Sequence, residues 1–248
     1  MAIHGVKLEI IAGPCSAESE KQVLETAEGL KKAGIKDFRA GIWKPRSRLG
    51  SFEGMGVTAL PWLEEVKYEY GLEIMTEVAT PYHVDCALKH GMDRLWIGAR
   101  TSVNPFMISE LAESLRGVEI PIYVKNPVCP DVELWKGVIE RLKNVGIKDI
   151  SLIHRGFCLL DNSPYRNTPL WNLCTEVKHE FGDMPLYCDP SHIAGRRELI
   201  YDLCLQALKN NVDGLFIESH CNPDCALSDS LQQFTPSMLK ELLDNINS

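Results

Sequence analysis

The sequence predicts a single α/β domain spanning residues 1–248 and folded as a closed (β/α)8 barrel, a TIM barrel. Short apolar or β-branched runs alternate with longer amphipathic stretches, which is the pattern of parallel strands joined by helices. Eight such units fit into the 248 residues, and barrels of this size form one domain without splitting. No GxGxxG or Walker string indicates a nucleotide-binding doubly wound sheet.

The individual elements follow from local pattern. Apolar runs of strand length are expected to form strands at residues 8–12, 37–42, 73–77, 94–98, 120–125, 150–154, 186–189 and 214–218. Amphipathic stretches between them predict helices at residues 19–34, 58–71, 81–91, 104–117, 131–146, 168–182, 195–211 and 235–246. Several of these stretches end at a glycine, the residue that most often follows a helix because it tolerates the left-handed conformation.

Composition excludes several classes of protein. Hydrophobic residues make up 45% and charged residues 24% of the chain, the usual balance for a globular protein. The longest apolar runs fall far short of the ~20 residues that span a bilayer, so no membrane association is expected. A net charge of −8 predicts a surface that repels nucleic acid. Nine cysteines without disulfide-framework spacing, and an N-terminus without a secretion signal, indicate reduced thiols in the cytoplasm.

Four short strings place a metal-binding side chain near the end of a predicted strand. They are GPCS, DPSH, IESH and LSD, with candidate ligands Cys15, His192, Glu218 and Asp229. A thiolate, an imidazole and two carboxylates together suit Zn²⁺, Fe²⁺, Mn²⁺ or Co²⁺ better than Mg²⁺ or Ca²⁺. Each residue alone could be structural. Their wide spacing argues against a structural zinc knuckle and favours one catalytic divalent metal site.

Basic side chains also gather where strands are expected to stop. Chemistry in such barrels takes place at the carboxyl ends of the strands. The cations expected there are Arg39, Lys44, Arg46, Arg100, Lys125 and Arg155, with Glu77 at the same level. In an otherwise acidic protein, this set predicts a small substrate that carries carboxylate and phosphate groups. Arg197 is expected instead on a solvated helix face or at a subunit contact.

Six strings carry a family resemblance: GPCSAES, KPRSRLGSFEGMG, IGAR, HRG, DPSHIAGRR and ESHCNPDCALSD. In order and spacing they resemble the type I 3-deoxy-D-arabino-heptulosonate 7-phosphate (DAHP) synthases of the primitive, beta subgroup. The resemblance implies metal-dependent condensation of phosphoenolpyruvate with D-erythrose 4-phosphate and water, giving DAHP and phosphate. This is the first step of the shikimate pathway of aromatic amino acid biosynthesis.

The resemblance also implies roles for individual residues. The metal ligands would be Cys15, His192, Glu218 and Asp229, holding Mn²⁺, Co²⁺, Fe²⁺ or Zn²⁺. Phosphoenolpyruvate would be bound by Arg39, Lys44, Arg100, Lys125 and Arg155, with Ala99 in the same site and Glu77 holding a water. Arg46 and Ser47 match the erythrose 4-phosphate phosphate site. The expected catalytic residues are Lys44, Cys15 and His192.

Two strings depart from the common family pattern. The KRG string of the family is replaced by KNPVCPDVELWKG after Lys125, and HRG replaces ERG at 154–156. The first variant resembles the subgroup fused to a C-terminal chorismate mutase. This sequence contains neither a mutase module nor an N-terminal ferredoxin-like regulatory domain, so we expect a homo-oligomer, a dimer or tetramer, with a mutase partner fused or in trans. Trp62 and Trp135 are expected to pack against the sheet by default, or to contribute to an exposed docking patch.

Three alternatives stay open at this point. The same barrel supports 3-deoxy-D-manno-octulosonate 8-phosphate synthesis, although those enzymes typically carry an Asn-bearing string in place of KPRS. The Arg of KPRS is expected to hold the phosphate of the shorter aldose. A weakly catalytic barrel could serve mainly to dock a chorismate mutase. A Schiff-base aldolase would use one lysine without metal.

Overall fold

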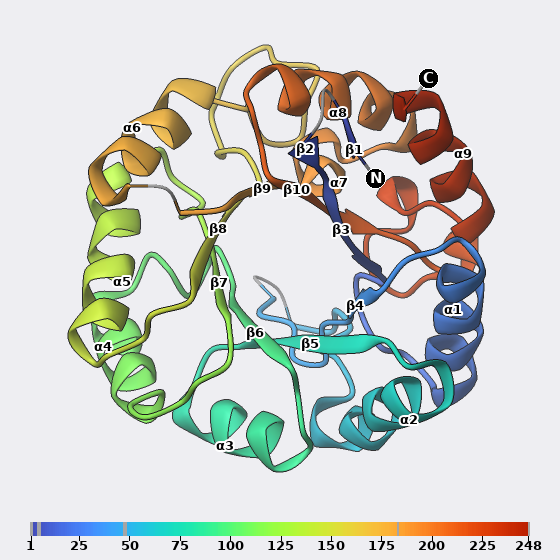
Figure 1. Ribbon diagram of the computed structural model, residues 1–248, viewed down its shortest axis with the longest axis horizontal. Coiled ribbons are helices and arrows are strands. Elements are labelled where there is room, and N and C mark those ends of the chain that lie inside the picture. Colours follow the sequence, from blue (N-terminus) through green and yellow to red (C-terminus); the bar gives the residue numbers. More distant parts are fainter. Residues whose placement is uncertain (1, 4–5, 47–48, 183, 248) are drawn as a thin grey trace.

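The computed structural model describes residues 2–3, 6–46, 49–182 and 184–247. Within these residues, eight parallel strands close into a barrel in the order β10-β3-β4-β5-β6-β7-β8-β9, with the helices outside (Figure 1). The barrel strands are β3 (Glu9–Gly13), β4 (Asp37–Arg39), β5 (Glu73–Val78), β6 (Arg94–Ile97), β7 (Ile122–Lys125), β8 (Ile150–His154), β9 (Leu186–Cys188) and β10 (Gly214–Glu218). Strands adjacent in sequence are adjacent in space, so the predicted (β/α)8 barrel is confirmed.

Local capping explains where the helices begin. The outer helices are α1 (Glu20–Lys32), α2 (Leu60–Tyr70), α3 (Pro81–Lys89), α4 (Pro105–Ser114), α5 (Val132–Asn144), α6 (Trp171–Phe181), α8 (Ile200–Lys209) and α9 (Pro236–Asn247). Ser19, Asn104 and Asp131 accept hydrogen bonds from backbone N–H groups in the first turns of α1, α4 and α5. Such caps satisfy donors that the helix itself leaves unpaired.

The structure differs from the sequence prediction in four places. The strand expected at 37–42 ends at Arg39, because the chain then turns into the loop that carries Lys44, keeping only an isolated bridge between Gly41 and Ser16. The helix expected at 195–211 begins at residue 200, after a short 3-10 turn. A two-strand hairpin, β1 (Ala2–Ile3) with β2 (Val6–Lys7), and the short helix α7 (Pro190–Ala194) were not predicted, because elements this short leave no periodic signal.

Two apolar layers hold the barrel together. The interior is filled by Ile11, Met75, Trp96, Tyr123, Ile153, Tyr187 and Phe216. A second, larger layer lies between the strands and the surrounding helices. Trp135 of α5 is fully buried in it and donates its Nε1–H to the backbone oxygen of Val124, and Trp62 is half-buried against the same layer. Packing of these two tryptophans against the core is therefore confirmed.

An ion-pair cluster closes the end of the barrel where the strands begin. Arg94 lies 2.9 Å from Glu9, 2.7 Å from Asp37 and 2.6 Å from Glu73. The phenol of Tyr187 donates to Glu9 from inside the barrel. The candidate substrate-binding residues lie at the opposite, carboxyl end of the strands.

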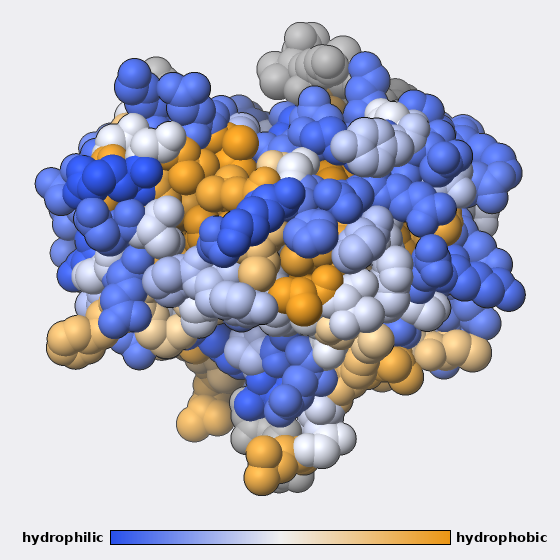
Figure 2. All heavy atoms as spheres, turned by 90° about the horizontal axis from the view of Figure 1, so that it is seen from below, coloured by the Kyte–Doolittle hydropathy of each residue, from blue (hydrophilic) through white to orange (hydrophobic). Residues whose placement is uncertain are grey.

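The flank of the molecule is largely hydrophilic, with apolar residues in separate small areas (Figure 2). Large apolar side chains that are strongly exposed include Leu49 and Leu160, in connections that follow barrel strands, and Phe106, in the first turn of α4. Within the described ranges, no helix is both long and apolar enough to cross a membrane.

Candidate active site and metal centre

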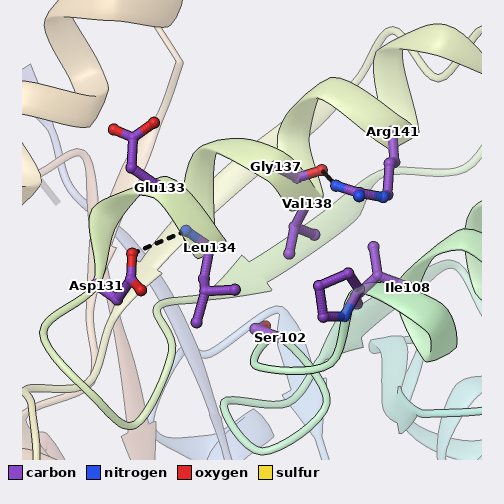
Figure 3. Close-up of a pocket in the computed structure, with 9 residues that line it drawn as sticks. Ser102, Ile108, Asp131, Glu133, Leu134, Gly137, Val138 and Arg141 are labelled. Atoms are coloured by element: carbon purple, nitrogen blue, oxygen red, sulfur yellow. Dashed lines mark hydrogen bonds between the residues drawn. The ribbon is translucent and has the colours of Figure 1, made fainter.

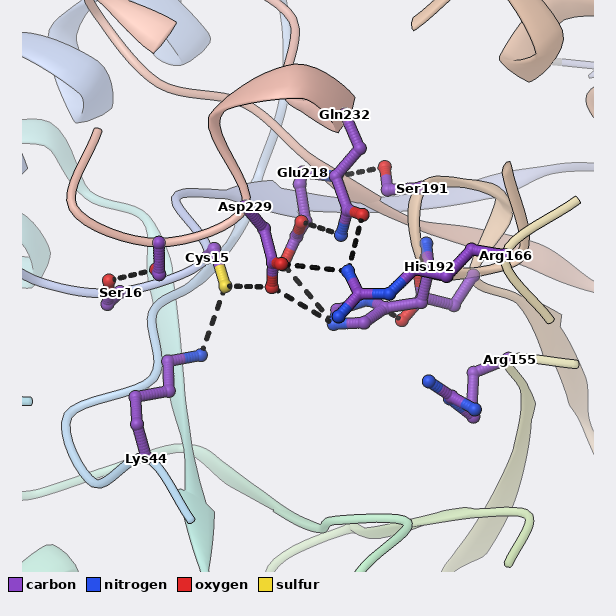
Figure 4. Close-up of polar contacts among 12 residues, drawn as sticks. Cys15, Ser16, Lys44, Arg155, Arg166, Ser191, His192, Glu218, Asp229 and Gln232 are labelled. Carbon is purple, nitrogen blue, oxygen red and sulfur yellow. Dashed lines mark hydrogen bonds and ion pairs between the residues drawn. The ribbon is translucent and has the colours of Figure 1, made fainter. Parts of the chain in front are cut away.

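The four candidate metal ligands meet at the carboxyl end of the barrel. Cys15 follows β3, Glu218 is the last residue of β10, His192 lies in α7 and Asp229 lies in the connection between β10 and α9. One ligand atom from each residue lies within 4.8 Å of all the others. Figure 4 shows the four side chains converging on one point. Residues separated by up to 214 positions are therefore brought together by the barrel.

The individual distances describe a site prepared for a cation. Cys15 Sγ lies 3.2 Å from Asp229 Oδ2. The Nε2 atom of His192 lies 3.7 Å from Glu218 Oε1 and 4.0 Å from Asp229 Oδ2. Its other ring nitrogen, Nδ1, lies 2.8 Å from Asp189 Oδ2, and this carboxylate contact orients the ring as in carboxylate–histidine–metal arrangements. The donor types and their approach fit a divalent transition metal.

Protonation of the ligands depends on their surroundings. Burial, followed by the charge of Glu218, raises the pKa of the Cys15 thiol to about 12, although Lys44 opposes the shift. Burial opposes ionisation of Glu218 and Asp229, but electrostatic interaction with His192, followed by Arg39 for Glu218 and Arg166 for Asp229, outweighs it and holds the pKa of each carboxyl below its usual range. The carboxylates are therefore ionised while the thiol keeps its proton, which metal binding must displace.

Cationic side chains surround the ligands. One cleft is lined by Lys44, Pro45, Arg46, Glu77, Gly98, Ala99, Arg100, Lys125, Arg155, His192 and Asp229. Lys44 Nζ donates to Cys15 Sγ at 3.3 Å, so this lysine connects the ligand cluster to the rim. The cleft combines five lysines and arginines with two of the candidate metal ligands, an arrangement that can hold an anion against a metal ion.

Asp189 joins the rim to the ligand cluster. It is fully buried, and its Oδ2 accepts from Lys125 Nζ at 2.7 Å while lying 2.8 Å from His192 Nδ1. Burial alone would raise the pKa of Asp189, but His192 and Lys125 hold it well below its usual value. One carboxylate thus positions both the imidazole of a candidate metal ligand, His192, and the ammonium group of Lys125.

Arg155 is held by an amide on the other side of the cleft. Its Nη1 donates to Asn167 Oδ1 at 2.7 Å, and Asn167 Nδ2 donates to the backbone oxygen of His192 at 2.7 Å. Burial lowers the pKa of Arg155 to about 10, with Arg166 and Arg100 adding to the shift and Asp189 opposing it. The guanidinium stays charged at neutral pH in a field of excess positive charge, which favours an anionic ligand.

Glu77 lies on the floor of the cleft. Its Oε2 accepts from Trp96 Nε1 at 3.2 Å. A Cβ atom added to Gly98 would lie 2.0 Å from Glu77 Oε1, so a larger residue there would require the Glu77 carboxylate to move. Gly98 of the IGAR string therefore lets this carboxylate approach the backbone before Ala99 and Arg100.

Three expected site residues occupy distinct surroundings. Arg39 is 1% exposed and pairs with Glu218 Oε1 at 3.0 Å, between the rings of Trp96 and Phe216. It therefore supports a metal ligand from below and does not line the cleft. Arg46 lines the cleft while its Nε donates to the backbone oxygen of Phe52. Ser47 lies outside the described residues.

Sequence reasoning missed several residues of this site. Asp189, Asn167, Arg166 and Gln232 all contact a predicted ligand or substrate-binding residue. The DPSH string contained a usable signal, because an Asp followed by Pro at a strand end is typical of a helix cap, and Asp189 accepts from the backbone N–H of His192. The other three have no local signal, since their partners are distant in sequence.

A separate hollow of about 210 Å³ lies between α4 and α5, outside the barrel (Figure 3). Its polar side chains already serve the helix: Asp131 accepts from Leu134 N–H, and Arg141 donates to the backbone oxygen of Gly137. The fold accounts for them, and they belong to no cluster of candidate ligands.

Comparison with known proteins agrees with this geometry. The sequence model of the DAHP synthetase I family matches residues 2–247. The chain belongs to this family. It is 31% identical over 237 residues to the phospho-2-dehydro-3-deoxyheptonate aldolase of Thermotoga maritima, covering 96% of this chain and 68% of that protein.

Solved structures extend the comparison. A crystal structure of the Thermotoga maritima DAHP synthase superposes with a TM-score of 0.84 at 30% identity, over 96% of this chain and 68% of that one. A truncated form of the Thermotoga enzyme gives a TM-score of 0.81 at 28% identity, covering 96% and 85% of the two chains. The 2-dehydro-3-deoxyphosphooctonate aldolase of a Synechococcus strain is 29% identical over 259 residues, covering 95% and 84% of the two chains.

Proposed function

We propose that this DAHP synthase family member condenses phosphoenolpyruvate with D-erythrose 4-phosphate and water, releasing DAHP and phosphate. It thereby acts as a 3-deoxy-7-phosphoheptulonate synthase at the entry to the shikimate pathway. The observation that carries the proposal is the four-ligand cluster of Cys15, His192, Glu218 and Asp229 opening onto a cationic cleft. A metal site beside several lysines and arginines fits two phosphorylated substrates, one of which has a carbonyl group to polarise.

The substrates are assigned to different cations. Arg100 follows β6, Lys125 ends β7 and Arg155 follows β8, and we assign them to the carboxylate and phosphate of phosphoenolpyruvate. Arg46 and Ser47 are assigned to the phosphate of erythrose 4-phosphate. Arg39 is buried and donates to Glu218. We assign it to the phosphoenolpyruvate site because it positions this candidate metal ligand beside the cleft.

The reaction requires a carbon–carbon bond and the loss of phosphate. C3 of phosphoenolpyruvate attacks the aldehyde carbon of erythrose 4-phosphate, water adds at C2, and cleavage of the C–O bond expels phosphate. A bound divalent metal supplies Lewis acidity for the aldehyde oxygen. Lys44, beside Cys15, can donate the proton that converts this oxygen to a hydroxyl group. Glu77 faces the cleft and is assigned to hold the water.

The octulosonate reaction is the competing assignment. The octulosonate relatives are 28–29% identical to this chain, so overall similarity does not by itself separate the two reactions. KPRS favours the shorter aldose, because Arg46 lines the cleft where it can hold a phosphate close to the ligand cluster. An assay that follows phosphoenolpyruvate consumption with either erythrose 4-phosphate or arabinose 5-phosphate tests this choice. Faster turnover with arabinose 5-phosphate would contradict the proposal.

The metal and the cellular setting extend the proposal. We assign Mn²⁺, Co²⁺, Fe²⁺ or Zn²⁺ to the site on donor chemistry. The nine cysteines are all unpaired, which supports a reducing compartment such as the cytoplasm.

We further propose a homo-oligomer that binds a chorismate mutase domain. The support is the resemblance of the KNPVCPDVELWKG string to the subgroup fused to a mutase; the exposed Leu49, Phe106 and Leu160 are separate apolar side chains that a partner could cover. Light scattering tests the oligomer, and turnover measured with and without added mutase tests the partner. Monomers together with unchanged turnover at saturating mutase would contradict this part of the proposal.

A further inference from the structure

We propose that Arg166 and Gln232 act together as a carboxylate tie, which restricts Glu218 and Asp229 to binding the metal through one oxygen each. The inference rests on the metal site of the proposed function and deepens it. Neither residue is a candidate ligand itself. Their role is to position two ligands and to limit how many protein atoms reach the metal.

Three hydrogen bonds define the tie (Figure 4). Arg166 Nη1 donates to Asp229 Oδ1 at 2.8 Å and to Gln232 Oε1 at 3.0 Å. Gln232 Nε2 in turn donates to Glu218 Oε2 at 2.7 Å. One guanidinium group therefore holds both carboxylates, one directly and one through an amide.

The tied oxygens are not the ones that face the other ligands. In Asp229 the second oxygen, Oδ2, lies 3.2 Å from Cys15 Sγ and 4.0 Å from His192 Nε2. In Glu218 the second oxygen, Oε1, lies 3.7 Å from His192 Nε2. Asp229 thus turns Oδ2 toward the cluster and Glu218 turns Oε1, which also accepts from Arg39 Nη1 at 3.0 Å, while the remaining oxygen of each carboxylate is committed to the tie. A charge-assisted hydrogen bond to Arg166 is among the stronger ones available to a carboxylate.

The fold fixes this arrangement from several directions. Gln232 is 1% exposed, so its amide must be satisfied by protein groups. The backbone N–H of Arg166 donates to the backbone oxygen of Ala194 at 3.3 Å. A Cβ atom added at Gly195, where φ is +72°, would lie 2.6 Å from Arg166 Cβ. The connection from β8 to α6 is therefore seated against α7, which brings the guanidinium to Asp229.

The chemical consequence concerns coordination number. Two carboxylates that bind through both oxygens would contribute four ligand atoms, and with Cys15 and His192 the protein would supply six. When each binds through one oxygen, the protein supplies four, which leaves room for the oxygen of a substrate carbonyl, as catalytic metal sites require. Ca²⁺, which prefers six to eight oxygen ligands, is disfavoured by the same restriction.

The test is Co²⁺ titration of the full chain, with no substrate present. The intensity of the visible d–d bands reports coordination number, and competition with a chromophoric chelator reports affinity. We expect R166M and Q232L to show weaker bands than the unmutated chain and a Kd raised about 10- to 100-fold. The matched control is R197M. Arg197 holds the connection between β10 and α9, which carries Asp229 and Gln232, by donating to the backbone oxygens of Gln233 and Ser230. In the described structure it is hydrogen-bonded to neither Glu218 nor Asp229.

Each outcome decides a separate point. Unchanged bands and affinity in both variants would overturn the carboxylate tie, as would an equal change in R197M, since that would indicate general loosening of the connection. If Q232L does not fold, R166M decides alone, because the Arg166 side chain is 45% exposed. Failure of the unmutated chain to bind Co²⁺ would overturn the metal site together with the tie. Normal binding without DAHP formation would overturn the proposed function alone.

Discussion

Replacing Asp189 by asparagine is expected to disable the site while keeping its shape. The carboxylate is fully buried and contacts Lys125 Nζ at 2.7 Å and His192 Nδ1 at 2.8 Å. D189N removes the charge that compensates Lys125, whose side chain is only 6% exposed. It also replaces the carboxylate oxygen that faces His192 Nδ1 with an amide, whose NH2 group can turn toward the ring and cannot accept a hydrogen bond from it.

The magnitude follows from the burial of this pair. Removing one partner of a buried ion pair costs about 3–5 kcal/mol. Part of this cost falls on folding stability, so it sets an upper bound of roughly two to nearly four decades on the loss of kcat/KM for phosphoenolpyruvate, at about 1.4 kcal/mol per decade. We also expect weaker metal binding, since partners of metal-bound histidines typically affect affinity 10- to 100-fold.

The assay compares kcat/KM and Co²⁺ affinity in D189N with those of D213N. Asp213 accepts from Lys178 at 3.0 Å with a side chain that is 43% exposed, and it lies at the opposite end of the barrel strands, next to the start of β10. D213N should leave both quantities within severalfold of the unmutated chain. A D189N variant that folds and retains kcat/KM within tenfold would refute the bridging role of Asp189.

Three further predictions concern substrate binding, the thiol and acid stability. R46A should raise KM for erythrose 4-phosphate more than for phosphoenolpyruvate, and R155A should do the reverse. Loss of the charged hydrogen-bond donor should cost about 1.5–3 kcal/mol of substrate binding in each variant. If both variants affected the same substrate alone, the assignment would be contradicted. C15A should abolish most turnover and weaken metal binding, whereas C174A, in the buried face of α6, should retain turnover; equal losses would make Cys15 structural. Burial lowers the pKa of His154 to about 3. The free energy of unfolding should therefore fall by about 1.4 kcal/mol per pH unit as pH drops below ~6.5, because only the unfolded chain takes up the proton. Urea unfolding of H154L should lack this component, and a pH dependence identical to that of the unmutated chain would contradict the prediction.

The sequence was informative wherever function coincides with local pattern. Cys15, Glu218 and the rim cations each follow an apolar run, and strand ends are where barrels position chemistry. The fold class was predictable for the same reason, because eight alternating units leave few other arrangements. Strand boundaries were less predictable: Ala40 and Ile42 are buried and look like strand residues, yet the chain turns there toward Lys44.

Interactions between distant residues could not be predicted in the same way. Arg166 pairs with Asp229 across 63 positions and Asp189 pairs with Lys125 across 64, so no spacing rule connects them. Arg39 illustrates the same limit. Its substrate-binding role stays a prediction, and no sequence pattern indicated that it would be buried against the candidate ligand Glu218.

Metal dependence of the condensation tests the central claim most directly. Phosphoenolpyruvate consumption in the presence of erythrose 4-phosphate should cease after treatment with EDTA, because Cys15, His192, Glu218 and Asp229 converge within 4.8 Å to hold the ion that polarises the aldehyde. Addition of Mn²⁺ or Co²⁺ should restore activity, with DAHP and phosphate formed in equal amounts. Full activity in metal-free buffer, or no DAHP formation with any of the four metals, would contradict the account.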